Sequence, residues 1–294
     1  MELRGIIPAL ITPFADDEEL DPDGLRWMLD YVIGAGVHAV FVSGSAGEAY
    51  AMSVDERIKV FELAVEHVAG RVPVGAGTGA NTTRDAVRLS QAAEAAGCDY
   101  VSIITPSFIT PSAAELYDYF SAAAESVQLP VLLYGNPART NNPLPTELVA
   151  RLSRDHSNIR GIKDSTGDLQ QFAAYIRECP DDFWAIMGRD SLVLAGLQYG
   201  AVGAICATAN IVPEVLVRIY EHFQSGDVRE ALRLQQMINP LREAFALGSF
   251  PAMLKHAVRL LGRPAGVLRR PLKWLSAADE AKLIPLLKSV GCDL

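Results

Sequence analysis

The chain has 294 residues, of which half are apolar and 21% are charged, and its formal net charge at pH 7 is -9. A chain of this length can bury a large core, either as one α/β barrel or as two smaller domains, and its composition excludes a mostly disordered protein. The acidic balance, without any run of lysines and arginines, argues against a nucleic-acid partner.

Neither disulfides nor a membrane span is expected. The cysteines Cys98, Cys179, Cys206 and Cys292 lie far apart and form no C-x-x-C pair. With no secretory leader recognisable, they predict reduced thiols in a cytoplasmic protein. The uncharged stretch 192–213 is long enough to cross a membrane, but its glycines and polar residues favour a buried helix followed by a strand. We therefore expect no membrane partner.

Apolar runs alternate with amphipathic segments along most of the chain. The runs that predict strands are 5–12, 37–42, 72–76, 100–104, 131–134, 159–163, 183–187 and 202–206. The segments that predict helices are 21–36, 53–69, 82–96, 111–127, 145–154, 169–178 and 192–199. One of these helices begins at Ser53-Val54-Asp55-Glu56, which is typical of a capping box. A second has an apolar face made of Leu25, Met28, Leu29 and Val32.

Eight strand–helix alternations at a spacing of roughly 30 residues are typical of a (β/α)8 TIM barrel. A doubly wound open sheet is the competing fold, but it would have fewer strands and a glycine-rich dinucleotide turn. After about residue 225 only helical segments follow, at 227–247, 250–261 and 276–290. We predict an α/β barrel over residues 1–224 that carries the active site, and a three-helix C-terminal domain over residues 225–294.

One strand ends in a lysine. The apolar run that begins at Ile159 ends at Lys163, and the turn-forming residues Asp164, Ser165 and Thr166 follow directly. Catalytic residues of a β/α barrel lie at this end of its strands. Desolvation lowers the pKa of a lysine amine, and the neutral amine is a nucleophile for Schiff-base chemistry. The alternative is a solvated lysine at the start of a loop.

Other strand ends converge on the same cavity if the barrel forms. Ser45 and Ala46 follow the second strand, Tyr134 ends the fifth and Gly188 follows the seventh. An iminium formed on a lysine is an electron sink for carbanion formation, and a nearby tyrosine hydroxyl can move protons. Backbone amides of a Gly-Ser-Ala-Gly turn can bind a carboxylate. The histidines share no metal-ligand spacing, so no metal site is expected.

Three motifs in register resemble those of the dihydrodipicolinate synthase/N-acetylneuraminate lyase family. They are Gly44-Ser45-Ala46-Gly47-Glu48, Tyr134-Gly135-Asn136-Pro137 and Gly161-Ile162-Lys163-Asp164-Ser165, and the resemblance extends over essentially the whole chain. It implies a TIM-barrel aldolase or lyase that handles pyruvate without a cofactor, through a lysine Schiff base. It also implies a homotetramer arranged as a dimer of dimers.

The resemblance also implies residue roles. Lys163 would form the Schiff base, Tyr134 would shuttle protons, and the Ser45 hydroxyl with the amides of Ser45 and Ala46 would hold the keto-acid carboxylate. The main chain near Ile205 would contact the same ligand. Arg139 matches the arginine that fixes the carboxylate of the aldehyde substrate in dihydrodipicolinate synthases, a task that suits a bidentate guanidinium. A solvated loop arginine is its alternative.

Two positions depart from the pattern of the synthases. The family usually has Thr where Ala46 stands, and Phe108 aligns with a tyrosine that reaches into the site of a neighbouring subunit. One hydroxyl is therefore missing at Ala46, and phenylalanine at position 108 cannot relay a proton, so the usual Tyr–Thr–Tyr relay would be broken. Condensation of pyruvate with a carboxylated aldehyde such as aspartate semialdehyde is the leading hypothesis. A 2-keto-3-deoxy sugar-acid aldolase or dehydratase, and a non-catalytic keto-acid-binding paralogue, are the alternatives.

Overall fold

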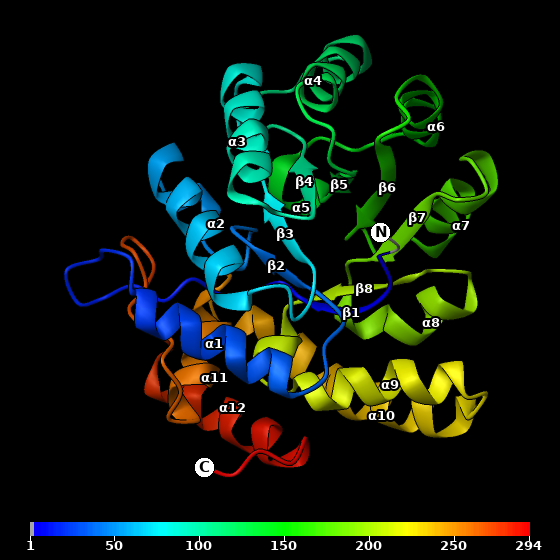
Figure 1. Cartoon of the computed structure of the whole chain (residues 1–294). Coiled ribbons are helices and arrows are strands. Elements are labelled where there is room, and N and C mark those ends of the chain that lie inside the picture. Colours follow the sequence, from blue (N-terminus) through cyan, green and yellow to red (C-terminus); the bar gives the residue numbers. More distant parts are fainter. Residues whose placement is uncertain (1–2) are drawn as a thin grey trace.

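Eight parallel strands form the centre of the molecule, as a computed structural model that describes residues 3–294 shows (Figure 1). Their order in the sheet is β1-β8-β7-β6-β5-β4-β3-β2, so strands that are consecutive in the chain are neighbours in space. The strands are β1 (Gly5–Pro8), β2 (Val40–Val42), β3 (Val74–Gly77), β4 (Tyr100–Ile104), β5 (Val131–Gly135), β6 (Ile159–Asp164), β7 (Trp184–Met187) and β8 (Gly203–Cys206).

The sheet closes into a barrel between its first two strands. Ala9 and Phe41 form a parallel bridge, and the amide of Leu10 donates to the Phe41 carbonyl at 2.9 Å. The amide of His38 donates to the Ile6 carbonyl, also at 2.9 Å. The (β/α)8 barrel predicted from the alternation is confirmed, and the open-sheet alternative is excluded.

Helices surround the barrel and continue beyond it. The α-helices are α1 (Pro22–Gly34), α2 (Val54–Val68), α3 (Thr83–Ala96), α4 (Ala113–Glu125), α5 (Pro137–Thr140), α6 (Thr146–Asp155), α7 (Leu169–Glu178), α8 (Val193–Gln198), α9 (Pro213–Gln224), α10 (Val228–Glu243), α11 (Ala252–Leu260) and α12 (Ala277–Ser289). Short 3-10 helices are η1 (Ala49–Ala51), η2 (Asp190–Leu192), η3 (Thr208–Asn210) and η4 (Ala244–Leu247). Within residues 3–294 no helix is long and apolar enough to cross a bilayer.

Local sequence signals explain most helix boundaries. The Ser53 hydroxyl accepts from the Glu56 amide at 3.2 Å, while the Glu56 carboxylate accepts from the Ser53 amide at 2.7 Å, so the predicted capping box is confirmed. Helix α4 begins later than predicted because Ser112, with Glu115, forms a second capping box. The predicted segments did not include α5, which is a single turn, or α9, which begins with Pro213 at its first position.

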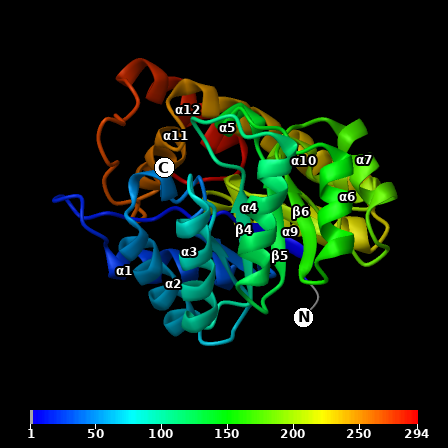
Figure 2. The ribbon, with the colours of Figure 1, turned by 90° about the horizontal axis from the view of Figure 1, so that it is seen from above.

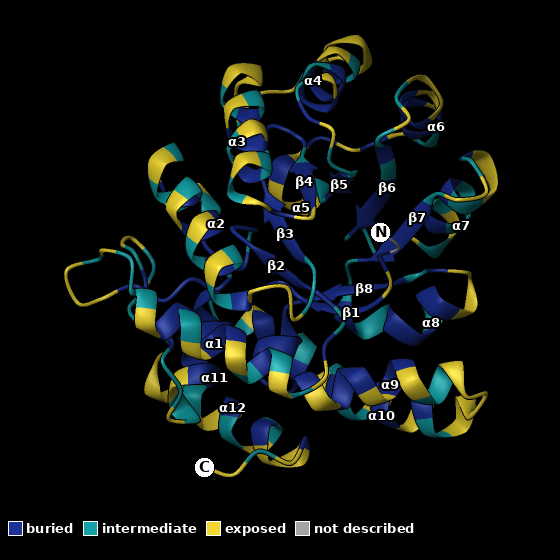
Figure 3. Cartoon of the chain, viewed as in Figure 1, coloured by how far each residue is buried: buried dark blue, intermediate teal, exposed yellow. Residues whose placement is uncertain are grey.

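Burial follows the predicted amphipathic pattern (Figure 3). The strands are buried along their length, and each surrounding helix turns its apolar face inward and its polar face to solvent. Leu25, Met28, Leu29 and Val32 of α1 are at most 2% exposed, as expected for the inner face of that helix.

The C-terminal helices lie at one end of the barrel. In Figure 2, α11 and α12 lie at the same end as α5, which follows the C-terminal end of β5. This arrangement brings the last part of the chain to the face where barrel enzymes carry their active sites. The division into a barrel over 1–224 and a helical domain over 225–294 stays a prediction.

Candidate active site

Lys163 is buried inside the barrel. It lies on β6, where it pairs with Tyr134 of β5 on one side and Ile186 of β7 on the other. Only 4% of the residue is exposed, and its Nζ lies 4.1 Å from the centre of the Tyr134 ring and 5.3 Å from that of Phe41. The alternative of a solvated lysine opening a loop is therefore wrong.

The turn after Lys163 is stabilised by its own side chains. The Asp164 carboxylate accepts from the Thr166 amide and hydroxyl, both at 2.9 Å. Ser165 donates its hydroxyl to the Gly188 carbonyl at 3.0 Å, which ties the end of β6 to the end of β7. These contacts hold the strand end that carries the lysine.

Tyr134 is a buried phenol in a polar setting. The Asn136 side-chain amide donates to its hydroxyl at 3.0 Å. Burial raises the pKa of Tyr134, but the positive charge of Lys163 lowers it. Hydrogen bonds with Ser165, Asn136 and Ser45 lower it further, and the net pKa lies below the usual tyrosine value. A phenol with a lowered pKa beside an amine is suited to proton transfer.

Ser45 and Ala46 lie in the turn after β2, but they differ in environment. Ser45 is partly exposed and lines the same cavity as Tyr134. Ala46 is 1% exposed, and its methyl group belongs to the buried core. The amides of Gly47 and Ala49 both donate to the Gly44 carbonyl, at 3.1 and 3.2 Å, which makes the turn compact.

Arg139 projects into the mouth of the cavity from α5. Its guanidinium lies 5.0 Å from the centre of the Phe250 ring, and no carboxylate of residues 3–294 forms an ion pair with it. An arginine without an acidic partner at a cavity mouth is free to bind an anionic ligand. Arg139 lines the cavity and is also exposed to solvent, so its role in binding a carboxylate stays a prediction.

Ile205 lies on β8, opposite Ile7 of β1, and is 1% exposed. Its side chain does not line the cavity. Burial raises the pKa of the adjacent thiol, Cys206, well above its usual value, and the positive charge of Lys163 partly opposes that effect. The end of β8 therefore lies within electrostatic reach of the lysine.

A cavity of about 550 Å³ is lined by some of these residues. Ser45, Tyr134 and Arg139 line it, and Lys163 lies against the rings of Tyr134 and Phe41, which are also lining residues. Lining residues that the sequence did not indicate include Tyr50, Arg57, Asn81, Phe250 and Leu272.

Some of the missed residues had a signal in the sequence. Asn136 and Ser165 lie two positions after Tyr134 and Lys163, inside motifs already singled out. Phe250 and Leu272 had none, since they reach the cavity only through the packing of the C-terminal segment. Among residues 3–294, no group of three or more His, Cys, Asp or Glu side chains could hold a metal ion.

Comparison with known proteins agrees with this geometry. A model of the dihydrodipicolinate synthetase family matches residues 2–290. The chain is 40% identical over 291 residues to a 4-hydroxy-tetrahydrodipicolinate synthase of Methanopyrus kandleri, covering 99% of this chain and 97% of the other. It is 41% identical over 291 residues to the enzyme of the same name from Methanoculleus marisnigri, with 98% and 99% covered.

Solved structures agree equally well. The dihydrodipicolinate synthase of Aquifex aeolicus superposes with a TM-score of 0.96 at 30% identity, with 99% of both chains covered. A prophage protein of the dihydrodipicolinic acid synthase family from E. coli K12, solved in complex with pyruvate, superposes with a TM-score of 0.95 at 35% identity, also over 99% of both chains. A match of this extent, on top of three motifs in register, shows that the chain belongs to the dihydrodipicolinate synthetase family.

Proposed function

We propose that the chain is a 4-hydroxy-tetrahydrodipicolinate synthase-like lyase that condenses pyruvate with aspartate semialdehyde through a Schiff base on Lys163. One observation carries the proposal: a buried lysine amine lies against a tyrosine of lowered pKa, and that tyrosine lines a cavity together with Ser45 and Arg139. The relatives that share the name 4-hydroxy-tetrahydrodipicolinate synthase support the choice of reaction.

The chemistry follows from these positions. The neutral Lys163 amine attacks C2 of pyruvate, water leaves, and an iminium forms. Loss of a proton from C3 gives an enamine, whose C3 then forms a bond to the aldehyde carbon. Tyr134 accepts and returns the protons, and the lysine is released when an amine or water displaces it from C2. The substrate is activated covalently, so the proposed steps need no cofactor or metal.

Substrate binding divides between two ends of the cavity. The turn with Ser45 and Ala46 offers a hydroxyl and backbone amides for the carboxylate of pyruvate, and the main chain near Ile205, on β8, would contact the same ligand. Arg139 has no carboxylate partner among residues 3–294, which suits it to the carboxylate of the aldehyde.

A homotetramer is part of the proposal, and the loop before α4 supports a contact with a second copy. Phe108 is fully exposed and Ile109 is 49% exposed, although the loop is held firmly. The Asn142 side-chain amide donates to the carbonyls of Pro106 and Ile109, at 2.8 and 2.7 Å. A rigid loop that presents two apolar side chains to water is suited to burial against another subunit. We also place the enzyme in the cytoplasm, because Cys98, Cys179, Cys206 and Cys292 are free thiols.

The missing hydroxyls at Ala46 and Phe108 favour a second candidate, an aldolase or dehydratase of 2-keto-3-deoxy sugar acids. Both candidates require the Schiff base, so they differ only in the acceptor or leaving group. A keto-acid-binding paralogue would bind without turnover.

Borohydride trapping tests the proposal. The wild-type chain and Lys163→Ala are incubated with pyruvate or with a longer keto-deoxy acid, reduced, and mapped by peptide mass. We expect a pyruvate adduct on Lys163, turnover with aspartate semialdehyde, and neither in the variant. An adduct only with the longer acids would move the assignment to sugar-acid chemistry. An adduct without turnover of any acceptor would favour the binding protein.

A further inference from the structure

A buried ion pair joins the turn at Ser45 to the C-terminal segment, and the proposed chemistry does not use it. Oε1 of Glu48 lies 2.7 Å from Nζ of Lys255 on α11, and both side chains are 0% exposed. The lysine also donates to the Val267 carbonyl at 2.6 Å, and its Nζ lies 4.5 Å from the centre of the Phe14 ring. The pair therefore has no access to solvent.

A second buried cation holds the other end of the same turn. Arg57 of α2 donates from Nε to the Ser43 hydroxyl at 3.1 Å. It also donates to the carbonyls of Gly77, the last residue of β3, and Gly79, at 2.7 and 3.0 Å. The turn that carries Ser45 thus begins at an arginine contact and ends at a lysine contact.

Both ends of the turn have a backbone conformation that side chains other than glycine rarely adopt. The φ of Ser43 is 53° and that of Glu48 is 55°, both in the left-handed region. Such conformations persist when surrounding contacts hold them in place. The contacts of Arg57 and Lys255 are at these two residues.

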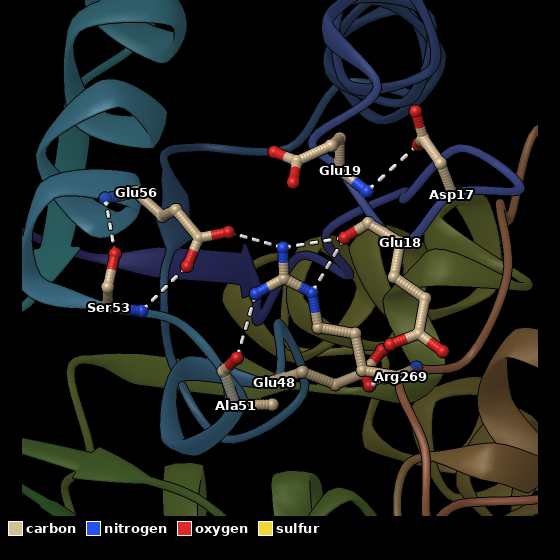
Figure 4. Close-up of polar contacts among 8 residues, drawn as sticks. All are labelled: Asp17, Glu18, Glu19, Glu48, Ala51, Ser53, Glu56 and Arg269. Atoms are coloured by element: carbon tan, nitrogen blue, oxygen red, sulfur yellow. Dashed lines mark hydrogen bonds and ion pairs between the residues drawn. The ribbon is translucent and has the colours of Figure 1, made fainter.

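Arg269 extends the connection beyond Glu48 (Figure 4). Its amide lies 3.4 Å from Oε2 of Glu48, and its guanidinium donates to the carbonyls of Ala51 and Glu18 and to the Glu56 carboxylate. The segment after α11 therefore contacts the chain from the end of the turn to the start of α2. The dashed lines that converge on the Arg269 guanidinium in Figure 4 show its contacts with Ala51, Glu18 and Glu56.

Stability alone does not account for the pair. Burial lowers the pKa of Lys255 to about 8, although Glu48 opposes the effect, and Arg269 lowers it further. Both charges are withdrawn from water, a cost that their mutual attraction must offset. Buried ion pairs with this balance can often be replaced by apolar side chains of similar volume without loss of stability.

We propose that Glu48 and Lys255 are positioning residues, through which the C-terminal segment fixes the turn that binds the carboxylate of the 2-oxo acid. This inference rests on the proposed function of that turn. It implies that the C-terminal helices are part of the active site and that they act on affinity for the oxo acid, not on the attack by Lys163.

The test compares wild type with Lys255→Met and with the double variant Glu48→Met/Lys255→Met. The double variant removes both charges at similar volume, so it avoids an unpaired buried carboxylate. The readouts are the pyruvate concentration that gives half-maximal borohydride trapping on Lys163, and the thermal midpoint. Lys282→Met is the matched control, because it removes an exposed Lys–Asp pair of the same 2.7 Å length from α12.

At pH 7 we expect the double variant to keep its thermal midpoint while its half-maximal pyruvate concentration rises about tenfold or more. The trapped fraction at saturation and the control should match wild type. An unchanged half-maximal concentration would overturn the inference.

Failure of the proposed function would look different. If wild type traps no pyruvate on Lys163, the proposed function is wrong. Hydrogen exchange of the amides over residues 43–49 then tests separately whether the Glu48–Lys255 pair holds the turn in place. Faster exchange in the double variant would support it, and unchanged exchange would overturn it.

Discussion

Tyr134 and Lys163 occupy matching positions on adjacent parallel strands, with the lysine Nζ 4.1 Å from the centre of the tyrosine ring. Because β5 and β6 are consecutive in the chain and neighbours in the sheet, this proximity needs only the correct register between two strands. The amine and the phenol act on each other electrostatically, and the phenol has the lowered pKa.

Substitutions of Tyr134 and Lys163 should have different effects. We expect Tyr134→Phe to keep borohydride trapping of pyruvate on Lys163 but to lose about 100-fold or more in turnover, because the amine remains while the proton carrier is gone. Lys163→Ala should lose both. Borohydride trapping at fixed times measures Schiff-base formation, and a turnover assay on the same samples measures the complete reaction. Full turnover in Tyr134→Phe would exclude the tyrosine as proton shuttle.

Arg139 should discriminate between the two substrates. Replacing it with Met should lower kcat/KM for aspartate semialdehyde by about tenfold to hundredfold, the value of a hydrogen bond to a charged group, and leave the KM for pyruvate unchanged. Arg151→Met is the matched control, since Arg151 also packs on an aromatic ring, that of Tyr117 at 4.0 Å, but lies on α6. Equal losses for both substrates would contradict the assignment.

A charged residue in place of Phe108 should weaken the contact between subunits. Phe108→Asp places a charge where we expect an apolar contact between subunits, so sedimentation equilibrium should give a smaller mass than that of wild type, most clearly at low protein concentration. Leu294→Asp, at another exposed apolar position, serves as control. If the variant retains the mass of wild type, the loop does not contribute to the interface.

Glu56 should govern part of the acid stability. Its pKa is lowered to about 2 from 4.5, chiefly by the hydrogen bond from Arg269. A carboxyl whose pKa is lower in the folded state contributes stability that is present above pH 4.5 and is lost as the pH falls toward 2. Glu56→Gln keeps a capping-box side chain but not the charge. Its thermal midpoint should therefore fall less steeply than that of wild type over this range.

The control for that measurement is Glu62→Gln, an exposed glutamate on the same helix. It should reproduce the slope of wild type. If Glu56→Gln has that slope as well, the contact between Glu56 and Arg269 does not contribute to acid stability.

Most local features of the chain could be predicted from its sequence. The strand and helix periodicity, the capping box at Ser53 and the position of Lys163 at a strand end depend on neighbours a few residues away; the helices α5 and α9 were not predicted. The proximity of Lys163 to Tyr134 followed as well, since consecutive strands of a barrel are adjacent. The departures at Ala46 and Phe108 were visible only against the family pattern.

The tertiary structure alone decided what comes from distant parts of the chain. Phe250 reaches the mouth of the cavity, and Lys255 reaches Glu48, only because the C-terminal helices pack at the carboxyl end of the barrel. No periodicity or spacing encodes such contacts, because they depend on closure of the barrel and on the angle at which the last helices pack. A lysine that would be solvated on an isolated helix is thereby buried with a carboxylate, and its charge acts at the turn beside Ser45.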